Sequence, residues 1–121
     1  MLQDDFFYFT PLQAEGNIIK TTLELNPAHQ IFVGHFPGNP IVPGVCMLQM
    51  VKEILENVIA NKTQLLKASD MKFLAVLNPN DNQFVDLELT YSIEDNNIKA
   101  EAKIQKGAAI FFKFKGIFII K

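Results

Sequence analysis

The sequence has 121 residues, of which 49% are hydrophobic and 20% are charged, and its formal net charge is −2. This composition argues against a disordered chain, and the length suits a single domain spanning residues 1–121. The slightly negative charge excludes a global basic field of the kind that attracts nucleic acid.

The start of the chain and its cysteine content indicate a cellular compartment. The first residues, MLQDDFFYF, include acids where a secretory signal needs basic side chains, and no apolar stretch approaches the roughly 20 residues of a membrane span. The single cysteine, Cys46, excludes an internal disulfide and fits a reducing compartment. We therefore expect a cytoplasmic protein without a membrane span.

The first half of the chain predicts a strand, a loop and a helix. Residues 18–25 alternate between apolar and polar side chains, as in a half-buried strand. A loop rich in glycine and proline follows, from about residue 26 to 43. Over residues 44–61 apolar side chains recur at helical spacing, with Glu53 and Glu56 elsewhere on the cylinder, which predicts one long helix. The apolar stripe of this helix contains Met47, Val51, Ile54, Leu55 and Val58.

Strand patterns dominate the second half. Residues 84–94 and 98–105 alternate clearly, and the turn 94–97 between them suits a hairpin. Residues 109–120 predict a last strand, apolar on both faces near its end, which suits a strand paired within the sheet and covered twice. Residues 65–75 give a weaker strand prediction. One helix cannot cover such a sheet lying flat, so we expect an α+β fold in which the sheet curls around the helix.

The segment GHFPGNPIVPGV, residues 34–45, contains three prolines and three glycines, which together specify a particular backbone path. This path would hold its one ionisable side chain, His35, in place. Pro43-Gly44 opens the helix without a Ser, Thr or Asp immediately ahead, so the first amides lack an obvious cap. A near-neutral base beside free amides at the positive end of a helix suits proton abstraction next to a thioester carbonyl.

The pattern H-F-P-G-x-P-x-x-P-G-V resembles the active-site signature of the FabZ-type 3-hydroxyacyl-acyl-carrier-protein dehydratases, and the element order agrees over nearly the whole chain. The resemblance implies the hot-dog fold, a curled antiparallel sheet wrapped around one long central helix. It also implies that His35 is the catalytic base and that the N–H of Gly44 binds the thioester carbonyl. Phe36, Pro43 and Val45 are expected beside the substrate, with Phe36 as a wall of the acyl pocket.

The same resemblance predicts the reaction and the partners. Water would be eliminated from a 3-hydroxyacyl thioester to give a trans-2-enoyl thioester, without metal or cofactor. The acyl chain would be carried by an acyl carrier protein, in fatty acid, lipid or polyene synthesis. The expected assembly is a homodimer or a dimer-based oligomer, with active sites at the dimer interface.

One position departs from the family pattern. Six residues after Pro43 the family places Glu or Asp, where this chain has Gln49. An amide can hydrogen-bond the substrate hydroxyl or a bound water, but it cannot deliver a proton at neutral pH. General acid–base help is typically worth about 10²–10⁴ in rate. Two alternatives therefore stay open: an acyl thioesterase on the same fold, and a non-catalytic acyl-binding or partner subunit.

Other polar residues have simpler interpretations. Cys46 lacks a convincing base partner and is interpreted as a small side chain packed in the first helical turn. His29 lies outside the motif and is interpreted as a loop or strand-end residue. Lys113 and Lys115 alternate with apolar residues and indicate a solvated strand face, although an acidic carrier protein would need a local basic patch of this kind.

Overall fold

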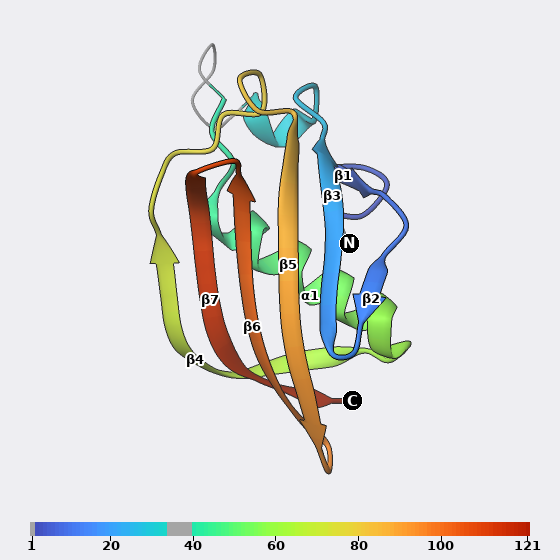
Figure 1. The fold of residues 1–121 in the computed structure, drawn as a ribbon. Helices are drawn as coiled ribbons and strands as arrows, with labels where there is room; N and C mark the ends of the chain where they lie inside the picture. The colour runs from blue at the N-terminus through green and yellow to red at the C-terminus, as the bar shows by residue number, and fades with distance from the viewer. Residues whose placement is uncertain (1, 34–39) are drawn as a thin grey trace.

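The computed structural model describes residues 2–33 and 40–121, which form one curled antiparallel sheet around a long helix (Figure 1). The strands are β1 (Phe7–Phe9), β2 (Gln13–Glu15), β3 (Ile18–Leu25), β4 (Thr63–Phe73), β5 (Phe84–Glu94), β6 (Asn97–Lys106) and β7 (Ala109–Ile120). The helix α1 spans Gly44–Ile59, and a short 3-10 turn, η1, spans Gln30–Phe32. The strand order is β1-β3-β5-β6-β7-β4, and β2 also pairs with β3.

Bulges allow the sheet to curl. The pairing of β4 with β7 shifts register between Leu65 and Lys67 and again between Ala68 and Asp70. Such irregularities bend a strand and increase its twist. Figure 1 shows β4 crossing behind the lower parts of β5, β6 and β7 and then rising beside β7. The predicted α+β arrangement, a curled sheet around one central helix, is confirmed.

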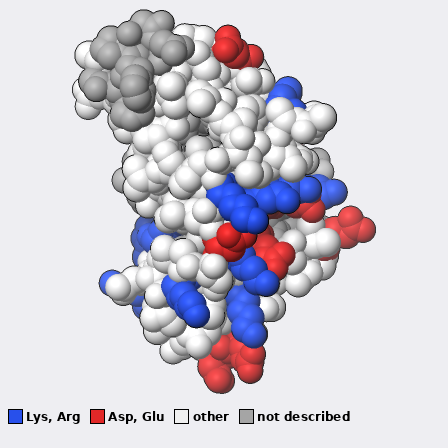
Figure 2. Space-filling model, turned by 90° about the vertical axis from the view of Figure 1, so that its left-hand side faces the viewer, with Lys and Arg blue, Asp and Glu red and all other residues white. Residues whose placement is uncertain are grey.

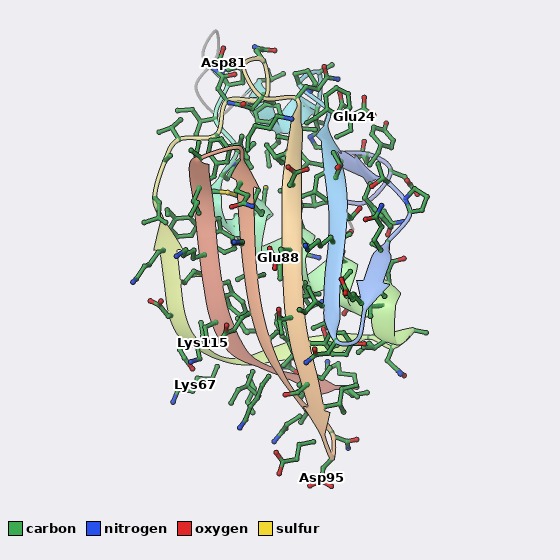
Figure 3. All side chains as sticks on the ribbon, in the orientation of Figure 1. Glu24, Lys67, Asp81, Glu88, Asp95 and Lys115 are labelled. Atoms are coloured by element: carbon green, nitrogen blue, oxygen red, sulfur yellow. The ribbon has the colours of Figure 1, made fainter. Side chains whose placement is uncertain are left out.

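The core lies between the concave face of the sheet and α1. The predicted stripe of α1 is buried except for Val58, which is only half-buried. Alternate residues of the central strands meet this stripe, as the period of two requires. Those of β5 and β6 are Val85, Leu87, Leu89, Ile98, Ala100, Ala102 and Ile104. Figure 3 shows side chains filling this interior, while labelled charged residues such as Glu88 and Lys115 lie outside it.

The predicted strands agree closely with the observed ones. The bounds of β3, β5 and β7 are those expected, β6 is longer by one residue at each end, and β4 spans 63–73 instead of 65–75. The helix ends two residues early because Ala60 adopts a left-handed conformation with φ of 56°. β1, β2 and η1 were not predicted from sequence, since three residues are too few to establish a period.

β7 lies between β6 and β4, so its predicted place within the sheet is confirmed. The prediction that both faces of β7 are covered is met only in part, because Ile117 and Ile119 on the outer face of this strand are half-buried.

Two carboxylates of α1, Glu53 and Glu56, are buried rather than solvated. The Glu56 carboxylate accepts hydrogen bonds from the backbone N–H and the hydroxyl of Thr63, at 2.7 and 3.0 Å, and from the ammonium of Lys52 at 3.1 Å. Burial by itself would raise the pKa of Glu56, but these contacts outweigh it and lower the pKa below its usual value. Glu56 therefore ties the end of α1 to the start of β4.

Candidate active site

The first turn of α1 presents uncapped amides. Pro43 is the N-cap residue and offers no side-chain hydrogen bond, while its carbonyl accepts from the amides of Cys46 and Met47 at 3.0 and 3.2 Å. Within residues 2–33 and 40–121, the amides of Gly44 and Val45 have no hydrogen-bond acceptor. Two N–H groups at the positive end of a 16-residue helix can therefore bind an oxygen that carries negative charge.

An aromatic ring lies against this turn. A Cβ atom on Gly44 would come within 2.6 Å of the ring of Phe73, so only glycine allows the ring to approach this closely. Phe73 stands at the end of β4 and stacks on Phe112 with ring centroids 5.2 Å apart. Half of its surface is exposed. Phe73 was not predicted as a site residue, because a phenylalanine at the end of a strand carries no sequence signal of a site.

Exposed apolar side chains adjoin the same turn. Val45 is 74% exposed, and Leu74 and Val76 after the end of β4 are also largely exposed. The loop that carries them is tied to the segment before α1 by a hydrogen bond from the Val42 amide to the Leu77 carbonyl, at 2.8 Å. A substrate with an acyl chain could therefore meet both free amides and apolar surface here.

Gln49 lies on α1, five residues after Gly44, and is half-buried. Its Nε2 donates a hydrogen bond of 2.8 Å to the carboxylate of Glu53. The amide thus has a structural partner, and among the described residues its oxygen has none. Of the other site residues predicted from sequence, Pro43 and Val45 lie at the start of α1, while His35 and Phe36 fall outside the described residues.

The remaining candidates have structural roles. Cys46 is buried, which raises the pKa of its thiol and opposes formation of the thiolate needed for nucleophilic attack. His29 caps η1: its Nδ1 accepts from the Ile31 amide at 3.0 Å, and its Nε2 lies 3.1 Å from the carboxylate of Asp5. His29 lies outside the first turn of α1, and the Cys46 side chain, although in that turn, is buried.

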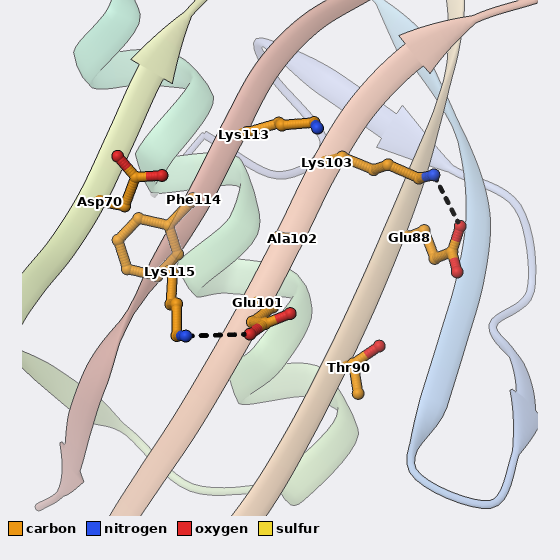
Figure 4. A pocket seen from close by; sticks show the side chains of 9 residues that line it. All are labelled: Asp70, Glu88, Thr90, Glu101, Ala102, Lys103, Lys113, Phe114 and Lys115. Atoms are coloured by element: carbon orange, nitrogen blue, oxygen red, sulfur yellow. Dashed lines mark ion pairs between the residues drawn. The ribbon is translucent and has the colours of Figure 1, made fainter.

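The outer face of the sheet carries paired charges. Figure 4 shows a shallow depression there, in which Lys115 lies 3.6 Å from Glu101 and Lys103 lies 3.7 Å from Glu88. Lys113 stands opposite Lys103 in the strand register and has no ion pair among the described residues. Because acidic and basic side chains alternate, this face has the character of a solvated surface. Figure 2, seen from the β4 side, shows acidic and basic side chains next to one another in the lower half of the molecule.

Two absences apply to the described part of the chain. Residues 2–33 and 40–121 contain no group of three or more His, Cys, Asp or Glu side chains that could hold a metal ion. Over the same ranges, no helix has the length and apolar character needed to cross a membrane.

Solved structures place this architecture among the hot-dog folds. The dehydratase heterocomplex ApeI:P from Xenorhabdus doucetiae superposes with a TM-score of 0.74 at 18% identity, over 93% of this chain and 97% of that one. A putative thioesterase from Lactococcus lactis superposes with a TM-score of 0.64 at 12% identity, over 93% and 88% of the two chains. At such identities the likeness shows the fold alone, and it confirms the hot-dog prediction.

Sequence comparison then gives the family. Residues 12–112 match the ApeI-like family, described as ApeI dehydratase, and the chain therefore belongs to that family. Among curated proteins it is similar to two 3-hydroxyacyl-[acyl-carrier-protein] dehydratases named FabZ. The one from Fusobacterium nucleatum is 25% identical, with 90% of this chain and 80% of the relative covered. The one from Lactobacillus helveticus is 32% identical, with 78% and 69% covered.

Proposed function

We propose that this protein eliminates water from 3-hydroxyacyl thioesters carried on an acyl carrier protein, giving trans-2-enoyl thioesters. Its family and the motif at residues 34–45 support this reaction. The structural observation that carries the proposal is the first turn of α1, where the amides of Gly44 and Val45 have no acceptor within residues 2–33 and 40–121 and can therefore bind a thioester oxygen. Removal of the α-proton places negative charge on the thioester oxygen, and hydrogen bonds from these amides would stabilise that charge.

The proposed steps use three groups. The imidazole of His35 takes the proton from C2, while the Gly44 N–H donates a hydrogen bond to the thioester oxygen and stabilises the enolate charge. Gln49 holds the 3-hydroxyl of the substrate. The C3–O bond then breaks as the double bond forms between C2 and C3, and protonated His35 returns its proton to the departing hydroxyl, which leaves as water.

Enoyl formation tests the proposal directly. A 3-hydroxyacyl thioester incubated with the protein should develop the ultraviolet absorbance of an enoyl thioester, and His35→Ala should reduce the rate at least 10²-fold, the lower end of general-base contributions. Assaying free thiol in the same mixture separates dehydration from hydrolysis. If thiol is released and no enoyl product forms at any chain length, the protein is a thioesterase.

We further propose that the active form is a homodimer whose sites form between two subunits. β4 is the long edge strand of the sheet, and its exposed side chains Leu66 and Met71 are apolar. Figure 2 shows few charged side chains in the upper half of the molecule as seen from that edge. Removing such an edge from water is a common way to stabilise an open sheet.

A partner-subunit role is the second candidate. The structure from Xenorhabdus doucetiae is a heterocomplex, and this chain has Gln49 where an acid is expected. A different hot-dog chain could then provide the missing carboxylate. Enoyl formation by the purified chain alone would exclude this candidate. The dehydratase proposal also includes a cytoplasmic location and a role in fatty acid, lipid or polyene synthesis.

A further inference from the structure

Glu53 is a buried carboxylate without a cationic partner. It lies in the middle of α1, is 0% exposed, and forms no ion pair within residues 2–33 and 40–121. Four hydrogen bonds replace the lost water. The Leu2 amide donates to both oxygens, at 3.1 and 2.8 Å, the Gln3 amide donates to Oε1 at 2.8 Å, and Nε2 of Gln49 donates to Oε2 at 2.8 Å. A buried charge is tolerated only when its acceptor sites are filled in this way.

This arrangement determines how the Gln49 amide is turned. An ionised carboxylate only accepts hydrogen bonds, so the atom of Gln49 that faces Glu53 must be the nitrogen. The amide oxygen then lies on the opposite side of the planar group. Because the Leu2 and Gln3 amides also bind the Glu53 oxygens, the carboxylate cannot rotate freely away from Gln49.

We infer that Glu53 is a positioning residue that makes Gln49 a hydrogen-bond acceptor toward the substrate, so that the site selects a 3-hydroxyl group over a 3-oxo group. This inference rests on the proposed function, in which Gln49 contacts position 3 of the acyl chain. A hydroxyl can donate to the Gln49 oxygen, whereas a ketone oxygen only accepts and would be left unsatisfied against it. The selected substrate class is therefore the reduced, 3-hydroxy chain, and the product of a ketone reduction must supply it.

The replacement Glu53→Gln should remove this selection. A glutamine at this place has a donor of its own, so the Gln49 amide is free to turn its N–H groups toward the substrate and accept a 3-oxo group. Two stable amide-linked pantetheine analogues, one 3-hydroxyacyl and one 3-oxoacyl, can be compared by calorimetry without turnover. In the wild type we expect the 3-hydroxy analogue to bind about tenfold more tightly, and in Glu53→Gln the ratio should fall to about one.

A double-mutant cycle and a matched control separate positioning from stability. In a Gln49→Met background, Glu53→Gln should not change the ratio further, since both changes act through one amide. Asn57→Ala is the control: Asn57 donates to the Gln3 side chain at 2.9 Å and to the backbone carbonyl of Glu53 at 2.8 Å, but it touches neither the Glu53 carboxylate nor Gln49. It should lower the melting temperature and leave the tenfold ratio intact.

The outcomes distinguish the two proposals. If Glu53→Gln keeps the ratio, or Asn57→Ala loses it equally, Glu53 only anchors the chain and the inference is wrong while the function stands. If the wild type binds neither analogue, both fail together. Should Glu53→Gln not fold, nuclear magnetic resonance of the wild type decides: the Gln49 side-chain amide signal should shift with the 3-hydroxy analogue and not with the 3-oxo analogue, and equal shifts would overturn the inference.

Discussion

Gln49 and Glu53 stand one helical turn apart on α1, and a 2.8 Å hydrogen bond joins their side chains. The sequence identified Gln49 as the departure from the family pattern, but it could not find the Glu53 contact, because Glu53 lies away from the apolar stripe of the helix. The N-terminal residues Leu2 and Gln3 cover Glu53 in the folded chain. Phe73 is a similar case, since only the fold brings the end of β4 against Gly44.

Replacing Gln49 by glutamate tests the contact between residues 49 and 53. Gln49→Glu would place a second carboxylate beside the buried one, so the repulsion should raise the pKa of the introduced carboxyl above its usual range. We expect a loss of roughly 1–3 kcal/mol in the free energy of unfolding at neutral pH, relieved as the pH falls and the introduced carboxyl takes up a proton. Urea denaturation at a series of pH values measures this.

Gln49→Met is the control, because it removes the hydrogen bond without adding a charge and should show no comparable relief in acid. A Gln49→Glu protein as stable as the wild type at every pH would show that the two side chains do not meet in solution.

At the scale of the elements, α1 and β4 are joined by polar contacts as well as by the core. The Glu56 carboxylate caps the first amide of β4, that of Thr63, and pairs with Lys52 four residues earlier. The alternating and helical periods predicted both elements, because burial of one face is a property that each segment shows by itself. They could not predict this join, since Glu56 and Thr63 are close only after the chain reverses at Ala60.

The lowered pKa of Glu56 predicts a particular acid sensitivity. A carboxyl whose pKa is lower in the folded than in the unfolded chain adds stability above its usual value of 4.5, and this contribution is lost as the pH falls through the lower folded pKa. Glu56→Gln should therefore be less stable than the wild type at neutral pH, with the difference shrinking below about pH 4.5.

Denaturation midpoints across the acid range provide the measurement. Glu101→Gln is the matched control, because its pair with Lys115 is largely exposed and should contribute little at any pH. A difference between Glu56→Gln and the wild type that does not vary with pH would contradict the role of the charge.

For the whole molecule, the open edge at β4 bears on whether the active form is a single chain or a dimer. The strand has 11 residues, pairs with β7 alone among the described strands, and exposes Leu66 at 59% and Met71 at 41%. If two copies associate along this edge, introducing charge there should separate them. We expect the wild type to sediment as a dimer at micromolar concentrations, and the double variant Leu66→Lys, Met71→Lys to sediment as a monomer and to lose enoyl formation.

Ile93→Lys is the companion control, since Ile93 is half-exposed at the far end of β5 and should leave the dimer intact. A wild-type monomer, or a double variant that remains dimeric, would count against the β4 interface.

The sequence by itself determined the long elements and predicted where the site lies. Hydrophobic periods gave the long strands and α1, and the proline–glycine segment with Pro43 and Gly44 marked where the helix begins without a cap. Tertiary structure alone decided which side chains meet at that helix. Phe73 reaches Gly44, and Glu53 meets both Gln49 and the start of the chain, through contacts between segments far apart in sequence. Local patterns report the burial of a face, whereas the partner of a side chain depends on how the whole sheet curls.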